Sequence, residues 1–322
     1  MPWGFDSPLS HFMKKRFYNF KKRRTVTIIS LVIVVLLVLY IVAVIYSTGF
    51  FQSSKIDERD LSYWQYENGF IKNTDEYAQV GETKTCWFLI HSYTATPLEM
   101  KELSSTINSE FGDFVYGLKL SGHGEVPSKL EDKNLSIWYD EVEKKYLLFD
   151  FCDNINFVAS SLASSLALKF AEEHEVKNIY LINPFLEKPY KFYKILPYKT
   201  RVELFSDIFN YKKKKELGKI NSIEGQNNHV SYWNMPYSPI KNSLSFINEV
   251  ESNLSKIQNP IFIAYSENDE VAGSYSADLV YDSVSSKTKL KNNYKNSNHI
   301  LLLDYDKKYL IKGIINFEKS NR

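Results

Sequence analysis

The segment Ile155-Asn-Phe-Val-Ala-Ser-Ser-Leu-Ala-Ser164 decides the fold of this chain, because two kinds of local structure meet in it without a spacer. Its first half is a short apolar run, which is typical of a strand buried on both faces of a sheet. Its second half consists of small residues and leads into the helical stretch Ser165–Glu173. The segment therefore predicts a strand, a sharp turn at Ser161 and a helix.

The same alternation of strand and helix continues on both sides of this segment. Further apolar runs predict strands at Cys86–His91, Phe114–Leu120, Asn178–Ile182 and Pro260–Tyr265. Helical spacing is found at Pro97–Phe111, Ser136–Phe149, Ser274–Val284 and Lys307–Glu318, whereas Lys289–Tyr294 shows no clear pattern. Strands that alternate with helices predict an α/β fold, with a mostly parallel sheet that is flanked by helices on both faces.

Two segments do not follow this alternation of strands and helices. Residues 185–257 are rich in tyrosine, lysine and asparagine, and we interpret them as a small helical cap inserted into the domain 85–322. Helical pieces are expected at Val202–Phe209 and Ser243–Lys256, and the run Lys212–Lys215 is expected on a solvated helix face. Residues 47–84 are polar and aromatic, and they are expected to form a stalk followed by a small hairpin or loop.

The N-terminal part carries a separate signal. Residues Thr25–Tyr46 form an uncharged apolar run, long enough to cross the roughly 30 Å hydrocarbon core of a bilayer. The run is preceded by the basic residues Lys14, Lys15, Arg16, Lys21, Lys22, Arg23 and Arg24. This bias predicts a single-pass membrane protein, with residues 1–24 as a cytoplasmic tail, residues 25–46 as a transmembrane helix, and the domain in the periplasm or outside the cell. A cleaved signal peptide is the alternative, which the length of the run and the lack of an Ala-x-Ala site disfavour.

Composition narrows the range of functions. A formal net charge of +2 over 322 residues gives no electrostatic support for a nucleic-acid partner. The two cysteines, Cys86 and Cys152, are too few for a zinc ribbon or a disulfide framework. If their strands are neighbours, a single disulfide can join them, but two buried free thiols are the alternative that the sequence favours.

The turn at Ser161 matches the placement of a nucleophilic serine, which is held on a sharp strand-to-helix turn. Asp269 follows the strand Pro260–Tyr265, and His299 precedes the last helix. A serine hydroxyl needs an imidazole to take its proton, and the imidazole needs a carboxylate to orient it. We therefore predict that Ser161, Asp269 and His299 form a catalytic triad, with Glu267 or Glu270 as alternatives to Asp269. His11, His174 and His229 are expected at the surface.

Several motifs occur in an order that resembles the α/β-hydrolase superfamily, and within it the bacterial carboxylesterase and monoacylglycerol lipase branch. The resemblance extends from about Trp87 to Phe317. It rests on Leu89-Ile-His-Ser-Tyr-Thr-Ala-Thr-Pro97, Leu120-Ser-Gly-His-Gly124, the turn at Ser161, Pro260–Val271 and Ser297-Asn-His299.

This resemblance implies the roles of the site residues. Ser161 matches the nucleophile, Asp269 the acid and His299 the base, while the backbone N–H groups of Tyr93 and Leu162 match the oxyanion-hole donors. It implies hydrolysis of carboxylic esters, acyl or lipid-like, through an acyl-serine intermediate, without a metal or an organic cofactor. His91 and His123 match positions that shape loops.

The chain departs from this pattern at its glycines. The usual Gly-x-Ser-x-Gly reads Ala159-Ser160-Ser161-Leu162-Ala163, and Ser92 follows His91 where a glycine is usual. These glycines allow strand and helix to approach closely around a strained serine. Two other readings therefore stay open: an inactive α/β-hydrolase fold that serves as a binding or scaffold protein, and a thioesterase or peptidase on the same fold.

Overall fold

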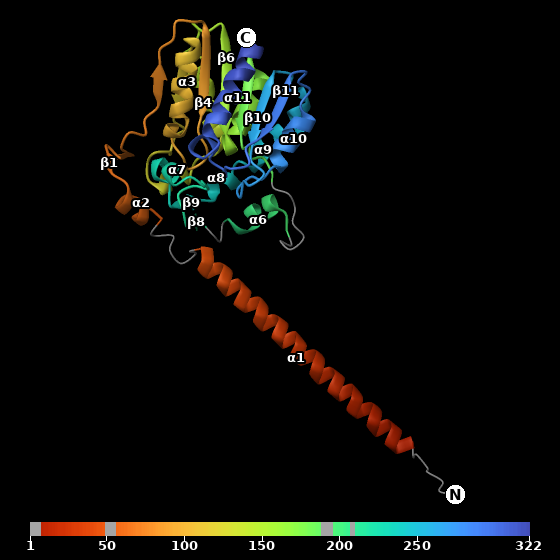
Figure 1. Cartoon of the computed structure of the whole chain (residues 1–322). Coiled ribbons are helices and arrows are strands. Elements are labelled where there is room, and N and C mark those ends of the chain that lie inside the picture. Colours follow the sequence, from red (N-terminus) through yellow and green to blue (C-terminus); the bar gives the residue numbers. More distant parts are fainter. Residues whose placement is uncertain (1–7, 49–55, 188–195, 207–209) are drawn as a thin grey trace. The chain divides into compact units, whose positions relative to one another are not determined.

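The computed structural model describes residues 8–48, 56–187, 196–206 and 210–322, and the chain divides into two compact units between Phe51 and Gln52. The first unit is the helix α1 (Pro8–Thr48), drawn in red in Figure 1. It contains the stretch Lys22–Val42, which is long and apolar enough to cross a membrane, and this stretch is not buried against other described residues. The side chains of His11, Lys14, Lys15 and Lys21 lie outside the described set.

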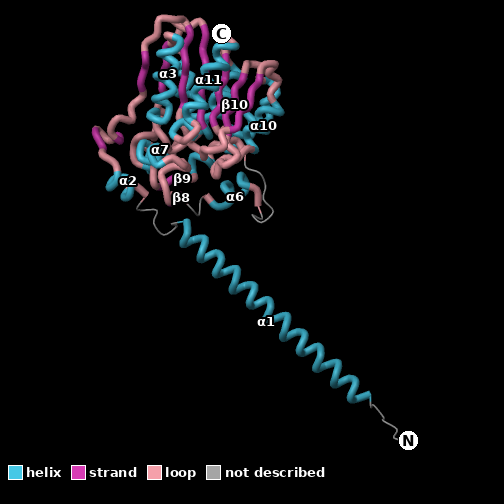
Figure 2. The backbone as a smooth tube through the Cα atoms, in the orientation of Figure 1, coloured by secondary structure: helices cyan, strands magenta, loops and turns pink. Residues whose placement is uncertain are grey.

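The second unit is built on a seven-stranded sheet, shown in magenta in Figure 2, with the strand order β11-β10-β7-β6-β4-β5-β3. The strands are β3 (Tyr77–Gln79), β4 (Thr85–Ile90), β5 (Phe114–Leu118), β6 (Asn154–Ser160), β7 (Asn178–Ile182), β10 (Ile261–Tyr265) and β11 (Lys289–Asn293). All pairs are parallel except the edge pair of β3 with β5, so the predicted mostly parallel sheet is confirmed. Strand β6, which carries the segment that ends at Ser161, lies at the centre.

Helices cover both faces of the sheet, as predicted. They are η2 (Pro97–Met100), α3 (Lys101–Phe111), α4 (Leu135–Tyr146), α5 (Ser164–Glu173), α9 (Leu244–Asn253), α10 (Tyr275–Ser283) and α11 (Lys307–Ser320). Along β4, Trp87 and Leu89 pack with α3 and α11 on one face, while Phe88 and Ile90 pack with α4, α5, α9 and α10 on the other. Because successive strand residues point to opposite faces, this continuous apolar strand is the one expected between two helical layers.

The insertion between β7 and β10 contains helices near both predicted positions, and in addition a short two-stranded sheet. Besides α9, it contains α6 (Tyr198–Phe205), α7 (Ile223–Asn228), α8 (Ser238–Lys241), η6 (Leu254–Lys256) and the antiparallel pair of β8 (Tyr211–Lys213) with β9 (Asn234–Pro236). Residues 188–195 and 207–209, which fall within the predicted cap, lie outside the described residues. The expected helix face at Lys212–Lys215 is wrong, because the run begins in β8.

The segment before the sheet is folded from Ile56 onward. It contains α2 (Glu58–Tyr63) and the hairpin of β1 (Tyr66–Glu67) with β2 (Phe70–Ile71). Trp64 Nε1–H donates to Ser231 O at 3.0 Å, and Trp233 N–H donates to Asp60 Oδ1 at 2.8 Å. These contacts attach the segment to the insertion, so this part of the expected stalk belongs to the compact domain. Residues 49–55 lie outside the described residues.

Cys86 and Cys152 form a disulfide bond, with their Cα atoms 5.9 Å apart. Cys86 lies in β4, and Cys152 lies two residues before β6, which pairs with β4. The expectation of two free thiols is therefore wrong. The sequence left the pairing open because it does not give the order of the strands.

Candidate active site

Ser161 lies where the central strand ends. It follows β6 directly and begins the short 3-10 turn η4 (Ser161–Ala163), after which α5 starts at Ser164. Its φ angle is 57°, in the left-handed region that a residue with a side chain rarely adopts. Such a conformation costs on the order of 1–3 kcal/mol, and strain of this kind is concentrated at functional sites.

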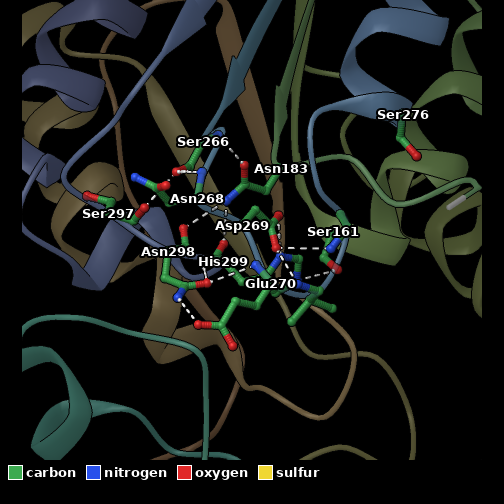
Figure 3. Close-up of polar contacts among 12 residues, drawn as sticks. Ser161, Asn183, Ser266, Asn268, Asp269, Glu270, Ser276, Ser297, Asn298 and His299 are labelled. Carbon is green, nitrogen blue, oxygen red and sulfur yellow. Dashed lines mark hydrogen bonds and ion pairs between the residues drawn. The ribbon is translucent and has the colours of Figure 1, made fainter. Parts of the chain in front are cut away.

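The structure brings the three predicted residues together in one hydrogen-bonded line, shown in Figure 3. Ser161 Oγ lies 2.8 Å from His299 Nε2, and His299 Nδ1 lies 2.8 Å from Asp269 Oδ2. With Nδ1 protonated, His299 donates to Asp269, and its Nε2 lone pair accepts from the serine hydroxyl. All three side chains are buried, and they come from the turns after β6, β10 and β11.

Asp269 is the carboxylate hydrogen-bonded to His299, and no hydrogen bond among the described residues joins His299 to the two predicted alternatives, Glu267 and Glu270. Glu267 and Glu270 are exposed, and Glu270 pairs with Lys219 at 2.7 Å. Asp269 Oδ1 also accepts from the amides of Val271 and Ala272, at 2.7 and 3.0 Å.

These contacts set the charge of Asp269. Burial acts to raise its pKa, but the charge of His299 and the hydrogen bonds outweigh burial, so the pKa is lowered. The carboxylate is therefore ionised at neutral pH and can stabilise a charged imidazole.

Asn183 links the loops that carry the acid and the base, and the sequence reasoning missed it. It follows β7 with a φ of 43°. Its Nδ2 donates to His299 O at 2.7 Å and to Asn298 O at 3.1 Å, while its Oδ1 accepts from Ser266 N–H at 2.8 Å (Figure 3). The signal that points to it is its place directly after a buried strand, since ligand and catalytic groups gather at the carboxyl ends of parallel strands.

Tyr93 and Leu162, the predicted oxyanion-hole residues, both line a small pocket beside Ser161, which has room for about one water molecule. Neither backbone N–H donates a hydrogen bond to another described residue. Two N–H groups without an acceptor are what a site for a developing negative charge requires. The pocket is lined by His91, Tyr93, Leu120, His123, Leu135, Trp138, Leu162, Ala163 and Leu166.

The histidines near the site are buried and uncharged. Burial lowers the pKa of His91 to about 4 and that of His123 well below its usual value, so the pocket carries no charge at neutral pH. His229 was expected at the surface, which is wrong: it is 3% exposed, and burial lowers its pKa to about 3. His174 is half-buried and hydrogen-bonded to Glu143 at 2.8 Å.

One group of side chains in the described part of the chain has the spacing of a metal site, namely Glu143, Glu173 and His174. Glu173 is already paired with Lys169 at 2.8 Å. Glu143 lies in α4, and Glu173 and His174 lie at the C-terminal end of α5, whereas Ser161 lies just before the N-terminal end of α5. It therefore takes no part in the arrangement around Ser161.

The sheet order, the serine turn after the central strand β6, and an acid and a histidine after β10 and β11 define an α/β-hydrolase fold. No protein-family model matches the chain. It is 24% identical to a thermostable monoacylglycerol lipase of Bacillus sp. (strain H-257) over 231 residues, which is 71% of this chain and 88% of that lipase. It is 22% identical to a carboxylesterase of Bacillus subtilis (strain 168) over 234 residues, 71% of this chain and 90% of that enzyme.

Solved structures agree on the fold. A structure of the metagenome-derived lipolytic enzymes LipS and LipT is similar with a TM-score of 0.69 at 20% identity, covering 80% of this chain and 100% of that one. The monoacylglycerol lipase of Paleococcus ferrophilus gives 0.65 at 12% identity, covering 77% and 99%. The chain therefore has the α/β-hydrolase fold and is similar to esterases and lipases.

Proposed function

We propose that the domain hydrolyses carboxylic esters through an acyl-serine intermediate formed on Ser161. The observation that carries this proposal is the line of two 2.8 Å contacts from Ser161 through His299 to Asp269, on a serine in a left-handed conformation. The named activities of the two Bacillus relatives support the same reaction class.

In this mechanism Ser161 Oγ attacks the ester carbonyl while His299 Nε2 takes its proton. The ionised Asp269 stabilises the imidazolium, and the amides of Tyr93 and Leu162 donate to the oxyanion of the tetrahedral intermediate. His299 then gives the proton to the leaving alcohol, and a water molecule repeats the cycle to release the acid. Apart from the ester and the water molecule, the steps use only groups of this chain.

The substrate is an acyl or lipid-like ester, such as a monoacylglycerol, and the domain works at a membrane surface outside the cytoplasm. The apolar helix α1 is the proposed anchor, and the basic residues before it give the orientation. The disulfide between Cys86 and Cys152 supports this placement independently, because such bonds persist in oxidising compartments.

The test uses the full chain in detergent micelles, with a fluorophosphonate probe and p-nitrophenyl acetate. We expect covalent labelling and ester hydrolysis in the wild type, both lost in Ser161→Ala, and hydrolysis lost in His299→Ala. A folded wild type that neither labels nor hydrolyses would establish the scaffold reading. Faster turnover of a matched thioester or amide than of the ester would favour the thioesterase or peptidase reading.

A further inference from the structure

Glu99 is a buried acid close to the proposed oxyanion hole, and the proposed mechanism does not use it. It lies in η2 and is 4% exposed. Its Oε2 accepts from Ser92 Oγ at 2.5 Å and from Ser92 N–H at 3.2 Å. It forms no ion pair with any described lysine or arginine, so the two donors of Ser92 are its main compensation for lost hydration.

Burying the Glu99 carboxylate costs free energy of folding, and this cost suggests that Glu99 has a functional role. A carboxylate moved out of water without a charged partner loses several kcal/mol unless hydrogen bonds replace its hydration. Burial accordingly raises the pKa of Glu99, while the hydroxyls of Ser92 and Ser160 and the charge of His299 act in the opposite direction.

Glu99 holds the residue directly before the peptide group that carries the Tyr93 N–H. Both donors of Ser92, its N–H and its Oγ–H, are directed at Glu99. The Ser92 carbonyl, which belongs to the Ser92–Tyr93 peptide group, accepts from Ala95 N–H at 3.0 Å and lies 2.9 Å from His91 Nδ1. On the other side of Tyr93, Thr94 has a φ of 67°, and its Oγ1 lies 3.0 Å from Ser231 Oγ. The loop is thus fixed on both sides of the amide in question.

We propose that Glu99 is a positioning residue of the oxyanion hole, which acts through Ser92 to direct the Tyr93 N–H at the developing oxyanion. This inference rests on the proposed ester hydrolysis. It gives a physical reason for serine at position 92: a glycine there has no hydroxyl to donate to the buried acid. Where a glycine would leave the backbone of this turn more freedom, Ser92 restricts it through its hydrogen bonds to Glu99.

The test compares Glu99→Ala and Glu99→Gln with a surface control, Glu102→Ala, in the full chain in detergent, using p-nitrophenyl acetate. Glu102 lies in α3, is exposed and pairs with Lys307 at 3.0 Å. Loss of one oxyanion donor typically lowers kcat by roughly 10²–10³-fold. We expect Glu99→Ala to lower kcat by about 10²-fold with KM unchanged, because the donor acts only in the transition state. Glu99→Gln should lose less, since its oxygen can still accept, and Glu102→Ala should match the wild type.

A double variant tests the pairing. If Ser92 and Glu99 act as a unit, Ser92→Gly combined with Glu99→Ala should lose no more kcat than Glu99→Ala alone. A wild-type enzyme with Ser161-dependent hydrolysis in which both Glu99 variants keep kcat within about threefold overturns the positioning role alone. A rise in KM at unchanged kcat overturns it too. If Glu99→Ala does not fold, Glu99→Gln decides. A wild type without Ser161-dependent hydrolysis overturns the proposed function and this inference with it.

Discussion

The disulfide offers a quantitative test of the domain's stability. Cys86 and Cys152 are 66 positions apart, and Cys86 is fully buried in β4. A cross-link removes conformational entropy from the unfolded chain by about 2.1 + 1.5R ln n cal/mol/K, where n is the loop length. For this loop the effect is about 4 kcal/mol at 25 °C. Replacing both cysteines by alanine should therefore lower the free energy of unfolding of the domain by about that amount.

The assay is urea unfolding of the full chain in detergent, followed by the fluorescence of buried tryptophans such as Trp87 and Trp138. Dithiothreitol should lower the unfolding free energy of the wild type to near that of the Cys86→Ala/Cys152→Ala variant, and it should leave the variant unchanged. In a thermal scan the same loss corresponds to roughly 10 °C. Equal stability of the wild type with and without reductant would refute the reasoning.

Three further predictions concern topology, the serine turn and pH. A reporter active only outside the cytoplasm, fused after Gln52, should be active, and activity of a cytoplasm-only reporter there would reverse the orientation. Ala163→Gly should keep or raise ester turnover, because Ala163 lines the pocket and glycine is smaller, and it should cost at most ~1 kcal/mol of stability; a tenfold loss of turnover would contradict this. Burial lowers the pKa of Lys214 from 10.5 to about 7, so the unfolded chain binds more protons above pH 7. Stability should therefore rise from pH 7 towards 10 in the wild type, and a similar rise in Lys214→Met would exclude this lysine as the cause.

The central strands could be predicted because their apolar composition indicates that both of their faces are buried. Strands β4, β6, β7 and β10 are mostly apolar and almost entirely buried, which is typical of a sheet covered on both faces. The edge strands were missed for the same physical reason. Strand β11, Lys-Leu-Lys-Asn-Asn, bonds to β10 on one side only and is mostly half-buried, so it needs no apolar pattern.

The insertion was less predictable because distant residues determine its structure. Lys214 follows two exposed lysines, and nothing local shows that its Nζ turns inward to donate to Ser231 Oγ at 2.9 Å and to Leu217 O at 2.6 Å. The charge of Asp60, which lies before the sheet, raises the pKa of Lys214 against the effect of burial. These partners are set by the fold and not by neighbouring sequence.

The residues of the candidate site also fall into those that the local sequence predicts and those that depend on distant contacts. Ser161, Asp269 and His299 could be proposed as site residues from the sequence, because each follows or precedes a recognisable element and because their chemistry requires one another. Asn183 and Glu99 were missed because their roles depend on contacts with backbone groups far away in the sequence, such as His299 O and Ser92 N–H. Residues that act on others through the backbone leave little trace in a single sequence.

Each residue that stands where the family usually has a glycine fits its surroundings in a different way. These surroundings help to decide whether the domain is an active or an inactive hydrolase. Ala159 is fully buried in β6 between β4 and β7, where a methyl group fits the core. Ala163 lines the pocket, and Ser92 donates a hydrogen bond to Glu99. An inactive site has no reason to keep Ser161 in a strained conformation, since this strain costs stability. The substitutions are therefore better explained as a reshaped hydrolase site than as decay, and this favours an active esterase over a scaffold.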